Sequence, residues 1–295
     1  MSAVPARAGL EASYKGREIE GLLDVHFYRP FGYVIALAAR ALRLSPAFLT
    51  VLGGAIGIGA GMFYRHAELP LTLIGMVLHV LSNAFDNADG QLARLTGTGS
   101  RAGRALDGLF DNLVFASIYL NLGLRLTFES QTSTIWLLVL FAAASHSSQS
   151  AAADYLRNAY LYFVGQKSEL ESSAVVQHSV QDLSWKENSW AKLLLSFYLN
   201  YTRQQERLMP ALRRLRTLAG EGRSFGQQYR QECKGVTALA GMLTTNARML
   251  VLFALLLFRM PLYYLLWEIV ALNVVLAIVL LRHHAVATKL AMAVR

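Results

Sequence analysis

Six apolar segments, each about as long as a bilayer-spanning helix, occupy much of this 295-residue chain. A helix needs roughly 20 mostly apolar residues to cross the hydrocarbon core of a membrane. Charged residues make up only 16% of the chain, against about 25% in an ordinary soluble domain. We therefore predict an all-α integral membrane protein, built as a bundle of six transmembrane helices. The predicted spans are Ala47–Tyr64, Leu71–Arg94, Gly103–Leu124, Thr134–Phe163, Val236–Phe258 and Leu262–Leu281.

The residues before the first span have a different character. Leu22–Leu44 mixes apolar residues with charged ones such as Asp24, Arg29 and Arg40. This pattern predicts an N-terminal interfacial amphipathic helix that lies along the membrane surface. The predicted organisation has four parts: a tail and interfacial helix (1–46), transmembrane helices one to four (47–164), a basic cytoplasmic amphipathic segment (165–235), and transmembrane helices five and six with a C-terminal tail (236–295).

The distribution of positive charge predicts the topology. Eleven lysines and arginines lie between residues 165 and 235, and more follow the second and the sixth span. With six spans these basic pieces all fall on one side, which the positive-inside rule identifies as cytoplasmic.

Within the basic segment, Trp185–Leu218 has apolar residues at helical spacing and a proline at position 210. Two helices broken at Pro210 are expected there.

Acidic residues are concentrated in one part of this apolar chain. Four of its seven aspartates are Asp86, Asp89, Asp107 and Asp111. If spans two and three form an antiparallel hairpin that turns near Thr98, the two pairs lie at matching depths, because a helix rises ~1.5 Å per residue. Spacings of three and four residues also place each pair on one helix face. We therefore expect all four carboxylates to converge on one polar cavity, formed mainly by spans two and three and open to the cytoplasm.

Four carboxylates at membrane depth need cations to remain ionised together. The cluster has no histidine or cysteine ligand, so it suits Mg²⁺, Mn²⁺ or Ca²⁺ rather than zinc. Two divalent cations would balance four negative charges and could bind a diphosphate. The small residues Gly90, Ala93 and Gly103 leave space beside the helices, and Arg94 lies where the cavity would open, suited to a phosphate. A cation transporter and a soluble acidic hairpin are the alternatives that these residues leave open.

The spacing of these residues resembles that of a known family. The pattern D-x2-D-G-x2-A-R-x8-G-x3-D-x3-D is typical of the CDP-alcohol phosphotransferases (CDP-alcohol phosphatidyltransferases), integral membrane enzymes of phospholipid biosynthesis. Every fixed position is filled here, from Asp86 to Asp111. Residues 45–50 also resemble the Pro-Asn-x-x-Thr that opens the family's first span, with Ala47 in place of the asparagine.

The resemblance implies the chemistry and the roles of the residues. A CDP-linked donor binds through its diphosphate to two divalent ions, Mg²⁺ or Mn²⁺, an acceptor alcohol attacks phosphorus, and CMP leaves. It implies that Asp111 is the general base. The residues that would contact the CDP moiety are Gly90, Ala93, Arg94, Gly103 and Asp107. The residues that would hold the metals are Asp86, Asp89, Asp107 and Asp111.

Two arginines further along are candidates for ligand binding. Asp154-Tyr155-Leu156-Arg157 resembles the Ser-Tyr-x-Arg that related enzymes carry near the acceptor, with Asp154 in place of serine. Arg248 lies inside span five, where a buried arginine needs an anion that the cavity could supply.

A membrane prenyltransferase is the alternative enzyme class, since it too binds a diphosphate through metals and aspartates. Such an enzyme needs a second aspartate-rich motif, whereas only Asp154 and Asp182 follow Asp111 here. The resemblance also implies a homodimer and an active site that faces the cytoplasm, as in a bacterial inner membrane. The donor, CDP-diacylglycerol or a CDP-linked headgroup, and the acceptor alcohol both stay open.

Overall fold

The computed structural model describes residues 16, 18–186, 188–220 and 225–293, and these residues form helices and connecting turns with no strand. They belong to two compact units. Of the described residues, those up to 139 and those from 253 to 261 belong to the first unit, and those from 140 to 252 and from 262 onward belong to the second. Most of the predicted N-terminal tail lies outside the described residues.

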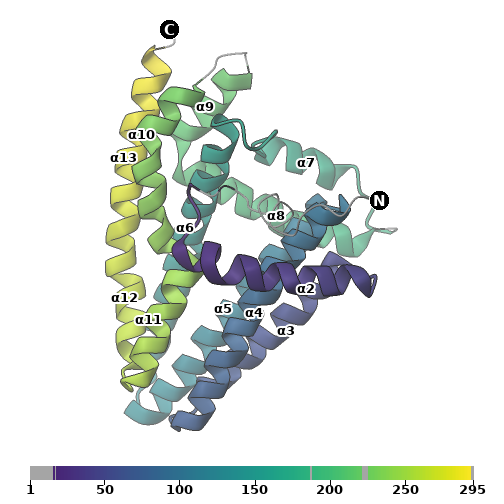
Figure 1. The fold of residues 1–295 in the computed structure, drawn as a ribbon. Coiled ribbons are helices and arrows are strands. Elements are labelled where there is room, and N and C mark those ends of the chain that lie inside the picture. The colour runs from purple at the N-terminus through teal and green to yellow at the C-terminus, as the bar shows by residue number, and fades with distance from the viewer. Residues whose placement is uncertain (1–15, 17, 187, 221–224, 294–295) are drawn as a thin grey trace. The chain divides into compact units, whose positions relative to one another are not determined.

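The first unit contains the segment with the aspartates. A short π-helical turn, η1 (Asp24–Tyr28), leads into α2 (Arg29–Ala41), followed by α3 (Pro46–Phe63), α4 (Leu69–Thr96) and α5 (Arg101–Ser130). Figure 1 shows α2 crossing α4, against which it packs. The small residues Gly32, Ala36 and Ala88 allow this close contact. Helix thus occupies most of the segment Leu22–Leu44, and an interfacial amphipathic helix there stays a prediction.

Glycines on α3 let two other helices pack closely against it. A Cβ atom added at Gly53 would lie 2.7 Å from Cβ of Phe85 on α4, and one added at Gly54 would lie 2.1 Å from Cδ1 of Phe110 on α5. Gly57 is close to both neighbours. Glycines at such spacing are typical of tightly packed membrane helices, because they let backbones approach. The closest backbone approaches of α4 and α5 are accordingly to α3 rather than to each other.

The second unit contains the rest of α6 (Ile135–Phe163), which starts in the first unit, and the basic segment. The basic segment folds as α7 (Ser173–Gln181), α8 (Ser189–Leu208) and α9 (Pro210–Gly220), with the predicted break at Pro210. Next along the chain come α10 (Gly226–Ala240), η2 (Gly241–Leu243), α11 (Thr245–Leu257), α12 (Pro261–Ile269) and α13 (Ala271–Ala293). Residues 253–261, at the end of α11 and the start of α12, belong to the first unit. Both α9 and α10 pack against α13. Helix α10 begins ten residues before the predicted start of span five at Val236.

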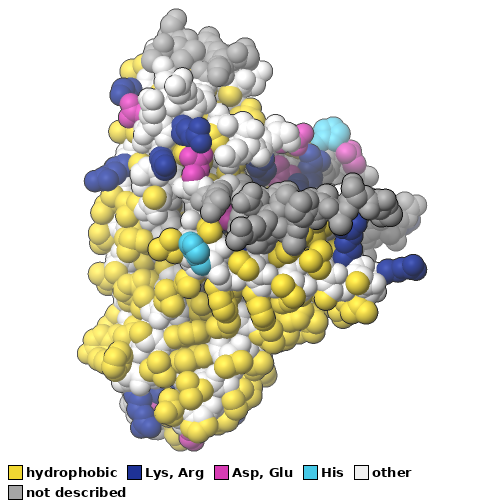
Figure 2. All heavy atoms as spheres, viewed as in Figure 1, with side chains coloured by type: hydrophobic (Ala, Val, Ile, Leu, Met, Phe, Trp, Pro, Cys, Tyr) yellow, Lys and Arg dark blue, Asp and Glu magenta, His cyan; other side chains and the backbone are white. Residues whose placement is uncertain are grey.

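Among the described residues, three stretches are long and apolar enough to cross a membrane: Pro46–Phe63, Leu69–Thr96 and Pro261–Met292. A fourth is possible if Gly226–Leu243 and Thr245–Leu257, which are bent by 41° relative to each other, form one broken span. Helices α5 and α6 have 30 and 29 residues but contain many polar side chains, so they are not among these candidates. On the face drawn in Figure 2, hydrophobic side chains cover the exposed surfaces of α3 and α4. The helical membrane character is thus clear, while the count of six spans stays a prediction.

Candidate active site

Local signals at three helix ends set the register of the acidic residues. Ser45 caps the N-terminus of α3 by accepting a hydrogen bond from the Phe48 N–H at 3.2 Å, so Thr50 lies in the first turns of α3. Helix α4 ends at Gly97, whose φ of 67° is left-handed and readily adopted by glycine. Ser100 then caps α5, accepting a hydrogen bond from the Gly103 N–H at 3.0 Å. The predicted turn near Thr98 is therefore confirmed.

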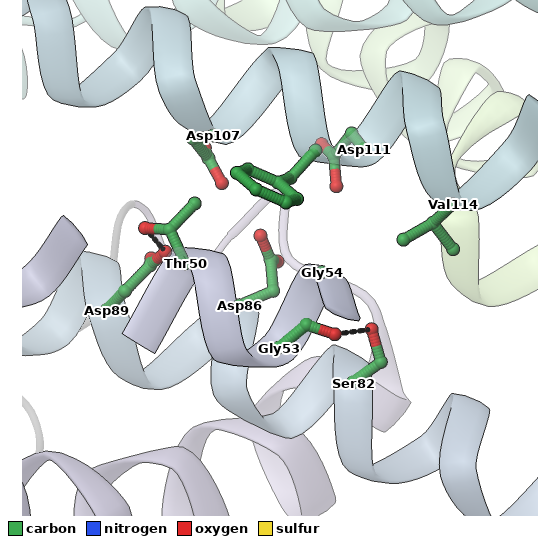
Figure 3. Close-up of a pocket in the computed structure, with 10 residues that line it drawn as sticks. Thr50, Gly53, Gly54, Ser82, Asp86, Asp89, Asp107, Asp111 and Val114 are labelled. Atoms are coloured by element: carbon green, nitrogen blue, oxygen red, sulfur yellow. Dashed lines mark hydrogen bonds between the residues drawn. The ribbon is translucent and has the colours of Figure 1, made fainter. Parts of the chain in front are cut away.

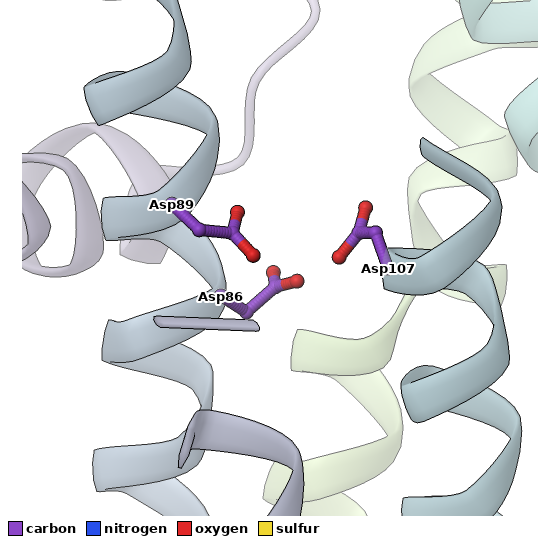
Figure 4. Close-up of side chains that lie close together, drawn as sticks. All are labelled: Asp86, Asp89 and Asp107. Carbon is purple, nitrogen blue, oxygen red and sulfur yellow. The ribbon is translucent and has the colours of Figure 1, made fainter. Parts of the chain in front are cut away.

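The aspartates of α4 and α5 face each other across a small space. Carboxylate oxygens of Asp86, Asp89 and Asp107 all lie within 4.8 Å of one another. Figure 4 shows the two carboxylates from α4 pointing toward that of Asp107 on α5. Asp89 is buried, and Asp107 is partly exposed. Three hard oxygen ligands at this separation could hold a divalent cation, and such ligands suit Mg²⁺, Mn²⁺ or Ca²⁺.

The fourth aspartate belongs to the same pocket but not to the close group. Asp111 lies one turn after Asp107 on α5, is exposed, and lines a pocket that encloses about 240 Å³ of space, part of it open to solvent. Figure 3 shows the pocket between α3, α4 and α5. Its lining residues are Thr50, Gly53, Gly54, Ser82, Asp86, Asp89, Asp107, Phe110, Asp111 and Val114.

Most residues that line this pocket belong to α4 and α5, as predicted, and helix α3 forms a further wall through Thr50, Gly53 and Gly54. Phe110 and Val114 of α5 and Ser82 of α4 each pack against α3 glycines. The Ser82 hydroxyl also donates a hydrogen bond to the Gly53 carbonyl at 2.8 Å. Helix α3 thereby separates the backbones of α4 and α5 and leaves room for their carboxylates between them. The sequence pattern gave the faces of α4 and α5 but not the helix that lies against both.

Thr50 is a site residue that sequence reasoning missed. Its hydroxyl donates a hydrogen bond to Oδ2 of the buried Asp89. A hydrogen-bond partner of this kind orients a metal-ligating carboxylate and can change the affinity of the site for the metal. The available signal was the position of Thr50 in the Ser45–Thr50 motif, which marks a helix start and does not reveal which side chain the threonine meets.

The other predicted contacts lie beyond the pocket wall, near the turn between α4 and α5. Gly90, Ala93, Arg94 and Gly103 are not among the lining residues. Arg94 is exposed, and its guanidinium lies beside Gly90, 3.4 Å from where a Cβ atom would be. These residues continue α4 and α5 toward the turn, and contacts from them to a ligand stay a prediction.

Arg157 and Arg248 belong to the second unit. Arg157 is partly buried on α6. Arg248 on α11 is 1% exposed and pairs with Glu268 on α12 at 2.9 Å, while its other nitrogens donate to Gln149 Oε1 and to the Leu243 carbonyl. The anion that a buried arginine requires is thus supplied by Glu268 within the protein. A ligand-binding role for either arginine stays a prediction.

These features define a class: a helical membrane protein with an acidic pocket, suited to a divalent cation, between its first long helices. Comparison with known families is consistent with it. The family model described as CDP-alcohol phosphatidyltransferase matches residues 43–161, and so confirms the resemblance over a segment that is less than half of the chain and contains all four aspartates of the motif. No curated protein and no solved structure gave a match.

Proposed function

We propose that this protein is a metal-dependent CDP-alcohol phosphotransferase. It would transfer a substituted phosphate group from a CDP-linked donor to an alcohol acceptor and release CMP, as a step of phospholipid biosynthesis. The observation that carries the proposal is the close approach of the Asp86, Asp89 and Asp107 carboxylates within the segment that matches the family model. The family match supports transfer of a phosphate-linked group. The requirement for a metal and the formation of a phospholipid are what the proposal adds.

The acidic residues fit a metal-bound diphosphate. Asp86, Asp89 and Asp107 would hold divalent ions, with Asp111 as a further ligand at the edge of the pocket. When bound, two Mg²⁺ or Mn²⁺ ions would neutralise the diphosphate and stabilise charge at the reacting phosphorus. Carboxylates alone would repel such a ligand, so ligand binding and metal binding are expected to depend on each other.

The protein's own side chains would have separate tasks in the transfer. Asp111 is exposed at the pocket wall, where an acceptor hydroxyl could approach, and it would remove the proton as that oxygen bonds to phosphorus. The bond from phosphorus to the CMP oxygen would break at the same time. Thr50 would hold Asp89 in place through its hydrogen bond. Arg94, beside Gly90, would lie along the nucleotide part of the donor.

The membrane arrangement is part of the same proposal. Six spans, with α5 and α6 crossing beside the apolar helices, would place the turn between α4 and α5 on the cytoplasmic side, with α2 along the surface. This suits a multi-pass protein of a bacterial inner membrane, where a lipid donor reaches the pocket sideways. A homodimer completes the proposal.

A metal-bound prenyl diphosphate is the competing ligand, and the structure gives it little support. Among the described residues, no second group of three acidic or other metal-ligating side chains comes together. The second motif that a prenyltransferase requires is therefore missing from that part of the chain.

The test is release of CMP by the purified protein. Radiolabelled CDP-diacylglycerol and CDP-linked headgroups would be offered with a panel of alcohol acceptors, with Mg²⁺, with Mn²⁺ and with a chelator. We expect metal-dependent CMP release that Asp107→Ala abolishes and that Asp182→Asn, an exposed aspartate on the basic segment, leaves unchanged. Lipid extracts from a bacterium expressing each form would identify the product. If no acceptor gives metal-dependent CMP release, the proposal is wrong.

A further inference from the structure

Helix α8 has a second face that the packing of the second unit does not use. Its inner face is buried through Leu194, Leu195 and Leu199. Three large apolar residues on the opposite side stay exposed, namely Trp190 at 61%, Leu193 at 46% and Phe197 at 58%. Their spacing of three and four residues places them on one face of the helix, and Trp185 just before it is 57% exposed. We name these four residues the aromatic stripe.

Positive charge accompanies the aromatic stripe. The Lys192 ammonium lies 5.3 Å from the centre of the Trp185 ring, within the range of a cation–π interaction. Arg203 and Arg207 are exposed further along the helix, and we name them the basic end. The one acidic residue of α8 is Glu206, which is buried and paired with Arg216. The exposed face of α8 therefore has cations and no carboxylate.

The orientation of α8 is fixed by polar contacts with its neighbours. Gln205 donates a hydrogen bond to Asp154 Oδ2 on α6 at 2.9 Å, and Gln204 donates one to Ser147 at 3.1 Å on the same helix. Glu206 accepts hydrogen bonds from the Ser173 N–H and hydroxyl at the start of α7. The aromatic stripe is thus held on a defined side of α8, next to a helix that we predict to cross the membrane.

We propose that the aromatic stripe and the basic end of α8 dock on a bilayer surface that contains anionic phospholipid headgroups. Tryptophan prefers the boundary between headgroups and acyl chains, and lysine and arginine prefer the anionic surface just outside it. A helix with both features along one face lies in the plane of the interface. Docking would remove the apolar stripe from water, which is favourable, and would bring the cations to phosphates. This inference does not depend on the proposed catalytic function.

The experiment measures the environment of Trp190 in the full-length protein. Replacing Trp136, Trp185 and Trp267 by phenylalanine leaves Trp190 as the single tryptophan. This variant would be placed in nanodiscs, one copy per disc, of phosphatidylcholine with or without phosphatidylglycerol and with or without bromine on the acyl chains near the headgroup. We expect brominated lipid to quench Trp190 emission, with a larger loss when phosphatidylglycerol is present. Absence of quenching by brominated lipid would overturn the proposal. Shielding of Trp190 that occurs only in discs with several copies of the protein would also overturn it, because a second copy would then be the partner that covers the stripe.

A charge variant and a second label complete the test. Arg203→Gln with Arg207→Gln should remove the dependence on phosphatidylglycerol, whereas Arg259→Gln, an exposed arginine after α11, should not. If the triple tryptophan variant does not fold, Phe197→Cys labelled with an environment-sensitive dye gives the same readout, because the native Cys233 is buried. Docking would be contradicted if the dye at position 197 in lipid discs had the same emission as a dye at a water-exposed control position.

Discussion

The Thr50 hydroxyl on α3 donates a hydrogen bond to the Asp89 carboxylate on α4, and so links the first helix of the acidic pocket to the most buried of its three close aspartates. This bond orients the Asp89 carboxylate within the pocket. It also explains why the start of α3, set by Ser45 and Pro46, matters for a site whose carboxylates lie on other helices.

Removing the Thr50 hydroxyl should weaken metal binding. Thr50→Val keeps the shape of the side chain but removes the hydrogen bond from the Thr50 hydroxyl to Asp89, and loss of such a contact typically lowers metal affinity or activity by about 10–100-fold. Thr50→Ser should retain most of the function. Titration of Mn²⁺, followed by its electron paramagnetic resonance signal, measures the affinity. Thr202→Val, which removes a buried threonine hydroxyl of α8, is the matched control and should bind Mn²⁺ normally. Equal affinity of Thr50→Val and wild type would contradict this role.

The contact between Gly54 and Phe110 should be sensitive to one added methyl group. Gly54→Ala would place its Cβ 2.1 Å from Phe110 Cδ1, so the ring that lines the pocket must move. We expect a loss of about 1–3 kcal/mol in stability, as for other overpacked cores, together with reduced CMP release. Gly59→Ala on the same helix is the control, because no atom lies within 4 Å of its added Cβ.

A double-mutant cycle distinguishes this clash from a general effect on α3. Phe110→Ala removes the ring, so Gly54→Ala should cost less stability in that background than in wild type. Thermal unfolding in detergent measures the four proteins. Strictly additive losses would indicate that the two residues do not interact.

Asp111 and Asp107 should differ in what they contribute. Asp111 is exposed and outside the close group, so Asp111→Asn should keep part of the binding of Mn²⁺ with CDP while turnover falls by about 10²-fold or more, as expected for loss of a general base. Asp107→Asn should lose both, because Asp107 completes the close group. Calorimetric titration and CMP release measure the two properties. Full turnover of Asp111→Asn would refute its assignment as the base.

Much of this site could be predicted from local sequence because helix geometry is local. The spacing of Asp86, Asp89 and Asp107 fixed their faces and depths, and Gly97 and Ser100 fixed the turn between their helices. What the sequence could not supply was the identity of tertiary neighbours. The glycines of α3 indicate close packing, but not that Phe110 and Phe85 are the residues packed there. Likewise the partner of Arg248 is twenty residues away, on another helix.

Arg248 and Glu268 should contribute to stability as a pair. Both are almost fully buried, so removing one leaves an uncompensated charge, which typically costs about 3–5 kcal/mol. Arg248→Met should therefore lower the unfolding temperature strongly, and Arg248→Met with Glu268→Gln should recover part of the loss. Measuring the KM for the CDP-linked donor on the folded fraction tests whether Arg248 binds the ligand. A large rise in KM with unchanged stability would favour ligand binding instead.

The ion pair that organises the basic segment should make its stability depend on pH. Burial alone would raise the pKa of Glu206, but hydrogen bonds from Ser173 and the Arg216 guanidinium, at 2.8 Å, hold this pKa below its usual value. A carboxyl group whose pKa is lower in the folded state stabilises the fold above its unfolded pKa, near 4.5, and this contribution is lost as the pH falls through the folded value. Thermal unfolding of wild type should therefore fall more steeply than that of Glu206→Gln as the pH is lowered through this range. Glu232→Gln breaks the exposed pair with Lys289 and should follow wild type, since exposed ion pairs contribute little. Parallel pH profiles for wild type and Glu206→Gln would show that Glu206 does not fasten α7, α8 and α9 together.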